Sequence, residues 1–520
     1  MEDFLNDWGL SLAVFLPVVG AAIMALIPRA EEQLHKVVAL ITTLAVAGMG
    51  VALLANFDMG RSKDLQFVVD ASWIDVINSR YIVGLDGISM PLMLLTMLIV
   101  PLCVIYSWNH FPEPHNPKAF LILILILETG MIGTFAAQDL ILFFVFFEIV
   151  LVPMYFLIGV WGGEERQYAA IKFFLFTLFG SALMLVSFLA LYFLADASGT
   201  AAGVANTFDM RALPEATAGI ALSTQVIIFG GMFLGFGIKV PMFPFHTWLP
   251  DAHTQAPTVG SVILAAILLK LGTYGFIRIA IPILPEAAIE WAPIIGGLAV
   301  IGIIYGALCC LAQTDMKRLI AFSSVAHMGY TMLGISTLTD FGMNAAVFGM
   351  VAHGLITGTL FFIAGSMKER YHTLEIKRLG GLLVSAPKMG WVFGLATMAS
   401  LGLPGLAGFW GEVPAILAAY SPAEGLSEPL FRAYMVIAAI GTVLAAGYLL
   451  WLYQRTAFGT PTEEFVDDPH ITDISIPEWV AWVPMIVLIL ALGIYPNLLF
   501  NLTDPAVVAV GDLVAAAAGS

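Results

Sequence analysis

Charged side chains are scarce in this sequence. Lysine, arginine, aspartate and glutamate make up only 11% of its 520 residues, whereas 60% of the residues are hydrophobic. A soluble domain is about one quarter charged, so this shortage excludes a soluble globular protein and indicates an integral membrane protein. Basic residues are the scarcer sign, and the net charge of −16 excludes nucleic-acid binding and a polybasic lipid-surface protein.

Cysteine and the short nucleotide-binding motifs are also rare. The three cysteines, Cys103, Cys309 and Cys310, lie in apolar runs and form no CxxC pair. We therefore expect small buried residues rather than a zinc or iron–sulfur site. The sequence has neither a P-loop nor a GxGxxG in a strand–helix context, which excludes an obvious nucleotide site. The acidic N-terminus has no basic segment, so we expect no cleaved signal peptide.

Long apolar runs dominate what is present. A membrane-spanning helix needs about 20 apolar residues, and the sequence predicts fourteen such spans. Their expected bounds are 8–27, 36–56, 86–108, 118–137, 139–161, 168–195, 223–248, 256–280, 290–313, 315–337, 341–367, 387–420, 432–456 and 479–502. We therefore predict an all-α polytopic membrane protein.

The seventh predicted span, 223–248, is interrupted beside a lysine. Lys239 lies midway along it, and Pro241 and Pro244 follow at once. Each proline removes a backbone N–H and clashes with the carbonyl four residues before it, so the helix must break there. Broken helices occur in membranes only where protein or a watered cavity satisfies the freed groups, and a mid-membrane lysine is expensive. The pattern indicates an ion site inside a helical bundle.

The twelfth predicted span, 387–420, repeats this pattern with an acid. Pro404 lies among four glycines, and Glu412 and Pro414 follow. The two breaks are five spans apart, which favours two repeats of five helices. Because five is an odd number, the second repeat must be inverted relative to the first, as in secondary transporters.

The predicted organisation therefore has four parts. Residues 1–117 form three N-terminal spans. Residues 118–280 form the first five-helix repeat, with its broken helix, and residues 281–456 form the second, inverted repeat with the other broken helix. Residues 457–520 form an acidic loop and the fourteenth helix.

Lysine and arginine are distributed unevenly between the two sides of the predicted bundle. With the N-terminus outside, 13 of them fall in inner loops and 6, among them Arg278, in outer loops. Since positive charge marks the cytoplasmic side, both termini are predicted on the periplasmic face. The loop 457–478 then falls inside, either as a solvated face or as a docking surface for a neighbouring subunit. Its acidic residues are Glu463, Glu464, Asp467, Asp468 and Asp473.

Glu148 lies in the fifth span, in a run with no other polar residue nearby. In hydrocarbon, an unpaired acid or lysine favours its neutral form, but each keeps the other charged when the two touch. Glu148 and Lys239 are therefore predicted partners whose protonation depends on contact. The alternative is a static buried salt bridge, which stabilises weakly because desolvation offsets the Coulomb attraction.

Three more ionisable residues follow inside later spans. Lys270 lies about midway along the eighth span, where it cannot easily snorkel and has no acid within a helical turn. His327 and His353 lie in the tenth and eleventh spans, and histidine titrates near physiological pH. A lone histidine on an apolar face is usually a satisfied core residue, but both fall between Lys270 and Glu412 in chain order. We therefore predict a hydrated proton relay through these residues.

Four further ionisable groups lie inside the spans or at their inner ends. Glu128 is another acid inside a span, and Lys172 is near the inner end of its span, where it either joins the relay or snorkels. His246 and His253 lie where the seventh span reaches the inner face, at a spacing that matches no zinc signature. We interpret these histidines as shaping the turn or as forming the mouth of an inner half-channel.

Five runs resemble the antiporter-like subunits of respiratory complex I, the proton-translocating NADH:quinone oxidoreductase. They are FFEIVLVPMYFLIG, KVPMFPFHTWLPDAHTQAPTVGSVILAAILLKLGTYG, TDMKRLIAFSSVAHMGY, VAHGLITGTLFFIAG and LPGLAGFWGE. The resemblance covers about residues 86–456. Glu412 at the second break is similar to the M-type (chain 4) subunits, whereas the L-type and N-type paralogues and their Mrp-antiporter relatives typically carry lysine there.

The resemblance implies fourteen helices with two inverted five-helix repeats. It implies that Glu148 pairs with Lys239, and that a central hydrophilic axis leads from Lys270 to Glu412 and on to the next subunit. Flavin mononucleotide and iron–sulfur clusters would lie on partner subunits and quinone outside this chain, so no cofactor or metal is expected here. Expected partners are the L-like and N-like paralogues, the lipid bilayer, protons and internal water. The expected location is a bacterial inner (plasma) membrane, with the mitochondrial inner membrane as the alternative.

We therefore predict a subunit that couples NADH-to-quinone electron transfer in other subunits to proton pumping. One alternative is an Mrp-type cation/proton antiporter subunit or a hydrogenase-linked membrane subunit, which would use the same bundle with another energy source. Glu412 argues against the Mrp type. A second alternative is a passive scaffold, which would gain nothing from ionisable residues strung through apolar spans.

Overall fold

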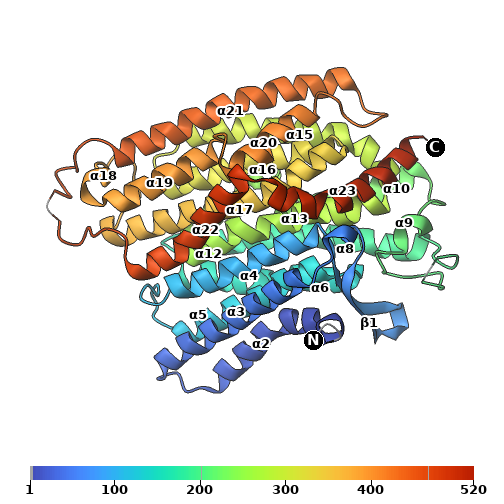
Figure 1. The fold of residues 1–520 in the computed structure, drawn as a ribbon, viewed down its shortest axis with the longest axis horizontal. Helices are drawn as coiled ribbons and strands as arrows, with labels where there is room; N and C mark the ends of the chain where they lie inside the picture. The colour runs from blue at the N-terminus through green and yellow to red at the C-terminus, as the bar shows by residue number, and fades with distance from the viewer. Residues whose placement is uncertain (1–3, 201, 467, 520) are drawn as a thin grey trace.

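The structure, a computed structural model of the chain, describes residues 4–200, 202–466 and 468–519. Its long helices lie side by side along one direction, and a β-hairpin lies at the same end of the bundle as the first and last described residues (Figure 1). We call this end the outer end. The opposite, inner end carries α18 (Leu382–Ser385). Asp467, predicted in the acidic loop, lies outside the described residues.

The first three spans carry the hairpin between the second and the third. The elements are η1 (Leu5–Gly9), α2 (Leu10–Leu26), α3 (Glu32–Ala55), η2 (Met59–Arg61), β1 (Gln66–Ile74), η3 (Asp75–Ile77), β2 (Ser79–Leu85) and α4 (Ser89–Tyr106). The two strands pair antiparallel, with Val69 opposite Val83 and Asp70 opposite Ile82. The hairpin therefore covers the outer end of this part of the bundle.

The next five spans include the first broken helix. The elements are α5 (Pro117–Ala136), α6 (Leu140–Ile149), α7 (Leu151–Trp161), α8 (Arg166–Leu194), α9 (Leu213–Ala216), α10 (Leu222–Lys239), η4 (Phe245–Thr247), α11 (Trp248–Gln255), α12 (Thr258–Ile263), η5 (Leu264–Leu268), α13 (Leu269–Gly275), η6 (Phe276–Ala280) and α14 (Ile281–Ile283). α10 ends at Lys239, because Pro241 and Pro244 cannot continue it. The predicted break is confirmed, and α11 extends the seventh span to residue 255.

The following five spans contain the second broken helix. The elements are α15 (Pro285–Leu311), α16 (Met316–Ser336), α17 (Asp340–Tyr371), α18, α19 (Pro387–Ser400), α20 (Ala407–Ala418) and α21 (Glu428–Ala457). Between α19 and α20 the chain turns at Gly402 and Gly405, whose φ angles of +77° and +91° suit glycine. The break predicted in the twelfth span is confirmed.

The last predicted span, 479–502, has the wrong bounds. α22 (Ile476–Ile494) ends just before Pro496, and a separate helix, α23 (Asn497–Ala518), follows. Asp504 and Asp512 interrupt the apolar run of α23, which hid this helix from a search for long apolar stretches. Among the described residues, fourteen helices are long and apolar enough to cross a membrane, but α23 is one of them and the divided twelfth span is not.

Arg278 was predicted in an outer loop, and the structure corrects this. It lies on η6, inside the eighth span, and donates to Asp86 Oδ2 at 2.8 Å and to Gln138 Oε1 at 3.2 Å. Its charge is therefore balanced within the bundle by an acid at the start of the third span. The hydropathy of residues 276–283 alone does not reveal this pairing.

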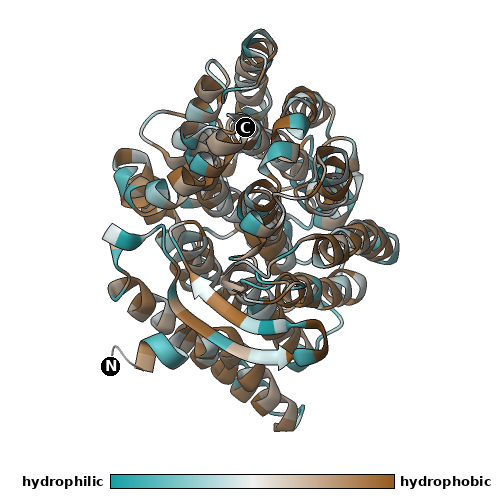
Figure 2. Cartoon of the chain, turned by 90° about the vertical axis from the view of Figure 1, so that its right-hand side faces the viewer, coloured by the Kyte–Doolittle hydropathy of each residue, from teal (hydrophilic) through white to brown (hydrophobic). Residues whose placement is uncertain are grey.

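The eighth, tenth and eleventh spans form the core of the bundle. Of the most apolar stretch of each, 94% is buried, against 33% for α3 and for α21. Hydrophobic colouring extends to the helices at the edge of the bundle (Figure 2), and many large hydrophobic side chains are exposed, as expected of a bundle whose surface faces lipid. The predicted residues Lys270, His327 and His353 belong to the three most enclosed spans.

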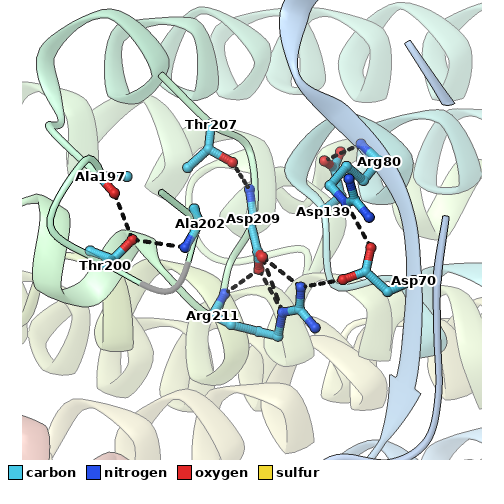
Figure 3. A network of polar contacts seen from close by, with 9 residues as sticks. All are labelled: Asp70, Arg80, Asp139, Ala197, Thr200, Ala202, Thr207, Asp209 and Arg211. Carbon is cyan, nitrogen blue, oxygen red and sulfur yellow. Dashed lines mark hydrogen bonds and ion pairs between the residues drawn. The ribbon is translucent and has the colours of Figure 1, made fainter. Parts of the chain in front are cut away.

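A polar network ties the hairpin to the loop before α10 at the outer end (Figure 3). Asp70 on β1 accepts from Arg80 Nε on β2 at 2.7 Å and from Arg211 Nη2 at 2.8 Å. Arg211 also donates to both carboxylate oxygens of Asp209. Asp139 caps α6 and accepts the backbone N–H of Arg80 at 3.0 Å. The network fixes three separate segments of the outer face to one another.

Candidate functional site

Lys270 lies at the centre of the bundle with two partners. Its Nζ is 2.6 Å from the carbonyl oxygen of Ala265 and 2.7 Å from His353 Nδ1, and its side chain is fully buried. The residue sits on α13 between the two π-helical turns η5 and η6. Such turns alter the regular helical register and are frequent at functional sites. Ala265, whose carbonyl accepts the hydrogen bond of Lys270, belongs to the first of these two turns.

A second contact continues from His327 to Glu412. His327 Nδ1 on α16 is 2.5 Å from Glu412 Oε1 on α20. The rings of His327 and His353 are 6.0 Å apart, centre to centre. His353 Nε2 is buried without a hydrogen-bond partner among the described residues. The structure therefore brings Lys270, His353, His327 and Glu412 into one row, with a single step between the two histidines.

A small cavity lies along that step. It is lined by His327, His353, Thr357, Ser400 and Glu412, among other residues, and about 20 Å³ of it is accessible to the centre of a water molecule. A buried water needs roughly 10–15 Å³ of such space and two to four polar partners. The cavity therefore has the size and the lining to hold a water between the two histidines.

Close helix packing places Glu412 beside the histidines. A Cβ at Gly411 would lie 2.5 Å from the Cα of Gly349 on α17, so the two backbones approach each other where both residues are glycine. Small residues at such crossings let membrane helices touch. The approach brings α20 against the helix that carries His353.

The other nitrogen of His327 faces two hydroxyl groups that the sequence did not reveal. Ser400 Oγ is 3.2 Å and Tyr448 Oη is 3.3 Å from His327 Nε2. Ser400 is the last residue of α19, directly before the second break, and that position was an available signal. Tyr448 lies on α21, 121 residues from His327, and nothing in its local sequence points to the contact.

The expected pair in the first repeat is not in contact. Among the ion pairs of the described residues none joins Glu148 to Lys239, and the buried Lys239 Nζ has no hydrogen-bond partner there. Instead, Nζ lies 4.6 Å from the ring centre of Phe147, the residue before Glu148. The face of an aromatic ring attracts a cation. Ser181 on α8 lies beside the Glu148 carboxyl, so each charge has a neutral neighbour.

Glu128 and Lys172 lie apart from the central row. Glu128 on α5 is fully buried, and neither of its carboxyl oxygens has a hydrogen-bond partner among the described residues. Lys172 on α8 donates to Asp251 Oδ2 on α11 at 2.7 Å. The structure therefore gives Lys172 a definite ion partner rather than a free position at the surface.

The two histidines of the seventh span lie near the inner end. His246 packs against Tyr305 with ring centres 5.0 Å apart, and His253 stacks on Phe361 at 4.5 Å. Neither ring nitrogen of the fully buried His253 has a partner among the described residues. His253 interacts electrostatically with both Lys270 and Lys317. Its buried ring is therefore within electrostatic reach of both lysines.

An inner cavity reaches the same region. It measures about 610 Å³ and is lined by His110, Gln255, Lys317, Lys368 and Glu369, among others. Lys317 on α16 is buried and donates to the carbonyl of Ala256 at 2.5 Å. Lys317 is one of the 13 basic residues predicted in inner loops, and nothing in its local sequence indicates this position in the cavity wall.

The fold and the row of buried lysine, histidine and glutamate define a class: polytopic membrane subunits with ionisable residues at two broken helices. Residues 137–426 match the transmembrane family of NADH:quinone oxidoreductase and Mrp antiporters, and residues 64–134 match the amino terminus of NADH-ubiquinone oxidoreductase chain 4. The chain belongs to the NADH-quinone oxidoreductase chain 4, or subunit M, family.

Individual relatives agree along nearly the whole chain. The NADH-quinone oxidoreductase subunit M of Rhodobacter capsulatus is 40% identical over 507 residues, which cover 96% of this chain and 95% of the relative. The NAD(P)H-quinone oxidoreductase chain 4 1 of a Picosynechococcus strain is 39% identical, over 99% of this chain and 94% of its own length.

Two solved structures share the fold. A chain of respiratory complex I from Thermus thermophilus with bound NADH has a TM-score of 0.85 at 30% identity, with 97% of this chain and 99% of that chain covered. A chain of the Mrp complex from a Dietzia species has a TM-score of 0.77 at 21% identity, with 97% of this chain and 52% of that chain covered. The second likeness shows the fold alone.

Proposed function

We propose that this chain is a proton-translocating membrane subunit of NADH:quinone oxidoreductase. The observation that carries the proposal is the row of contacts from Lys270 to His353 and from His327 to Glu412, at 2.7 Å and 2.5 Å. Four proton-exchanging groups aligned in the most enclosed part of a membrane bundle have no use in a scaffold. The relatives named NADH-quinone oxidoreductase subunit M indicate the redox enzyme to which we couple this row.

The row works as a relay in which each group holds a proton in turn. Lys270 gives a proton to His353 Nδ1, and the opposite nitrogen, Nε2, passes one to a water in the small cavity. The water protonates His327 Nε2, and His327 releases its Nδ1 proton to Glu412. Because a histidine ring takes a proton on one nitrogen and releases one from the other, each ring transmits charge without moving far.

Glu148 and Lys239 act as the switch. Two unit charges 4 Å apart interact by about 4 kcal/mol at an effective dielectric of 20, and one pKa unit corresponds to about 1.4 kcal/mol. Making or breaking this pair therefore changes a neighbouring lysine's proton affinity enough to load or unload it. The open arrangement, with Lys239 over Phe147, is one of the two states.

Proton uptake uses the inner cavity. Lys317 lines this cavity, and His253 interacts electrostatically with both Lys317 and Lys270. His246 and Lys172 lie on the same side of the bundle and border the uptake route. Glu128 is an additional buried acid of the first repeat that can hold a proton. Glu412, at the far end of the row, hands the proton to a neighbouring subunit.

The proposal includes partners and placement. Flavin mononucleotide and iron–sulfur clusters lie on other subunits, quinone binds outside this chain, and L-like and N-like paralogues flank it. Residues 118–280 and 281–456 form two inverted repeats, and the two broken helices occupy corresponding positions in them. The subunit lies in a bacterial inner membrane with both termini periplasmic. The Mrp-type alternative is not favoured, because the relatives near 40% identity carry oxidoreductase names and the Mrp likeness is at 21%.

The proposal is tested by Lys270→Ala in the intact enzyme. Inverted membrane vesicles are given NADH, and quinone reduction and lumen acidification are recorded together. We expect assembly to persist and pumping to fall at least about tenfold, as general acid–base groups contribute that much or more. The matched control is Lys388→Ala, an exposed lysine at the inner end. Normal pumping by an assembled Lys270→Ala enzyme would refute the relay.

A further inference from the structure

His327 has side-chain partners on both ring nitrogens, from three other helices. Nδ1 contacts Glu412 on α20, while Nε2 faces Ser400 on α19 at 3.2 Å and Tyr448 on α21 at 3.3 Å. All four residues are buried. The proposed relay uses Glu412 and the ring itself, and it assigns no role to the two hydroxyl groups.

The chemistry of the partners differs in one respect. A carboxylate only accepts hydrogen bonds, whereas a hydroxyl both donates and accepts. When Glu412 is ionised, Nδ1 carries the proton and Nε2 must accept one from a hydroxyl. When His327 is protonated, both nitrogens donate, and a hydroxyl must turn to accept from Nε2. A buried N–H without an acceptor would be costly.

Each hydroxyl group has an alternative hydrogen-bond partner. Tyr448 Oη also lies beside Ser323, which is one helical turn before His327 on α16. Ser400 lines the small cavity between the two histidines, whereas Tyr448 does not. Ser400 can therefore exchange its hydrogen bond with a water in the cavity, and Tyr448 can exchange its own with Ser323.

We propose that Ser400 and Tyr448 are positioning residues that hold His327 Nδ1 toward Glu412 and satisfy Nε2 in every protonation state. This inference rests on the proposed function. Neither residue accepts the transported proton at a reacting atom of its own. Each acts through His327, by removing the cost of a buried ring nitrogen that changes from acceptor to donor.

A few other titratable groups lie around the His327 ring. They are Glu412 on α20, His353 on α17, with Lys270 behind it, and Tyr330 on α16 itself, whose hydroxyl is taken by the carbonyl of Ala438 at 3.2 Å. Replacing the two hydroxyls therefore changes only the Nε2 side of the ring.

The test is the double variant Tyr448→Phe with Ser400→Ala in the assembled enzyme, in inverted vesicles with NADH. Both substitutions keep the packing shape and remove one hydroxyl each. Pumping should fall roughly threefold to tenfold, the effect of one or two hydrogen bonds. The neutral ring loses an ordinary hydrogen bond, but the protonated ring loses a stronger, charge-assisted one. The alkaline limb of the pumping pH profile should therefore move to lower pH by about half a unit to one unit.

Matched controls come from the same helices. Tyr453→Phe on α21 loses one bond to the carbonyl of Gly390, and Ser336→Ala on α16 loses one to the carbonyl of Leu333. Both controls should keep the wild-type rate and pH profile. Restoring either single hydroxyl to the double variant should recover part of the rate, because one hydroxyl can still serve Nε2.

Two results overturn the inference. An unchanged rate and profile in the double variant would show that Nε2 needs no hydroxyl. A lower rate with an unmoved alkaline limb would mean that the two residues only pack. Failure of the proposed function is recognised separately: His327→Ala, which leaves Ser400 and Tyr448 in place, would then pump normally.

Discussion

At the scale of single residues, two of the buried lysines, Lys270 and Lys239, are satisfied in different ways. Lys270 Nζ has a carbonyl oxygen and a histidine nitrogen within 2.7 Å. Lys239 Nζ has only the face of Phe147 at 4.6 Å. A lysine that is hydrogen-bonded to a histidine can exchange its proton with that histidine. A lysine that contacts only an aromatic ring has no group to exchange a proton with, and its proton affinity depends on the charges nearby. The two residues therefore suit a relay and a switch respectively.

The position of Glu412 gives a prediction that compares two substitutions. Glu412→Ala removes the partner of His327 Nδ1 and should lower pumping at least about tenfold. Glu412→Lys keeps a group that exchanges protons, so it should retain a measurable part of the rate. Pumping in inverted vesicles, normalised to quinone reduction, is the measurement. Equal rates for the two variants would mean that this position carries no proton.

A titratable pair at the inner end gives a prediction about pH. His110 Nδ1 is 2.9 Å from Glu369 Oε2, and this contact with the carboxylate, opposed by burial, raises the pKa of His110 above its ordinary value of 6.5. A raised pKa adds stability that is complete below pH 6.5 and is lost as the pH rises through the folded-state pKa. The partly exposed pair should contribute about 0.5 kcal/mol.

The measurement is the thermal unfolding of wild type and His110→Gln from pH 5.5 to pH 9. The difference between the two should be largest at the acidic end and should shrink above pH 6.5. His470→Gln, whose side chain is 79% exposed, is the control. A difference that stays constant with pH would show that the ion pair does not form in solution.

The residues of the relay were predicted from the sequence, but their contacts were not. Lys270, His327, His353 and Glu412 stand out because an ionisable group inside an apolar span needs a reason. Ser400 and Tyr448 carry no such signal, since serine and tyrosine are ordinary in membrane helices. Their contacts with His327 depend on how α19 and α21 pack against α16, across 73 and 121 residues of sequence.

At the scale of elements, both broken helices could be predicted because proline and glycine act locally. Pro241 and Pro244 end α10 whatever lies around it, and two left-handed glycines separate α19 from α20. α23 was missed for the opposite reason. Its buried side is a stripe that includes Leu499, Val507 and Val514, and two aspartates on the rest of the helix interrupt the apolar run.

The outer network predicts how the hairpin and the loop before α10 depend on each other. Burial acts to raise the pKa of Asp70, but hydrogen bonds from Arg211 and Arg80 outweigh it and lower the pKa. Asp70 is therefore ionised at neutral pH and clamps both arginines. Asp70→Asn should reduce stability by about 0.5–1 kcal/mol and free the loop at residues 202–212.

Limited proteolysis from the outer face measures this effect. Cleavage between residues 202 and 212 should be faster in Asp70→Asn than in wild type. The control is Asp64→Asn, which removes only an exposed pair with Arg61 on the same face. If the two variants are cleaved at the same rate, the hairpin does not hold the loop.

At the scale of the whole molecule, the proposed relay leads sideways from helix to helix rather than from one end of the bundle to the other. Its residues lie on α13, α17, α16 and α20, and the inner cavity is lined by other residues, such as Gln255 and Lys317. A lateral row needs a neighbour at its far end to release the proton outward. This geometry is why the proposal places a second subunit beside Glu412.

The direction of pumping depends on which end of the bundle faces the cytoplasm, and labelling can decide it. The loop between α8 and α9 lies at the outer end and the loop after α21 at the inner end (Figure 1), and their respective residues Ser198 and Glu463 are exposed. In a background with Cys103, Cys309 and Cys310 changed to alanine, a membrane-impermeant maleimide should label Ser198→Cys from the periplasm. It should label Glu463→Cys only in inverted vesicles. The physical reason is the excess of basic residues in the predicted inner loops, 13 against the 5 that remain in outer loops once Arg278 is left out, since positive charge is retained on the cytoplasmic side. The opposite labelling pattern would show that the inner cavity faces the periplasm. The cavity would then be an outlet for protons rather than the site of proton uptake.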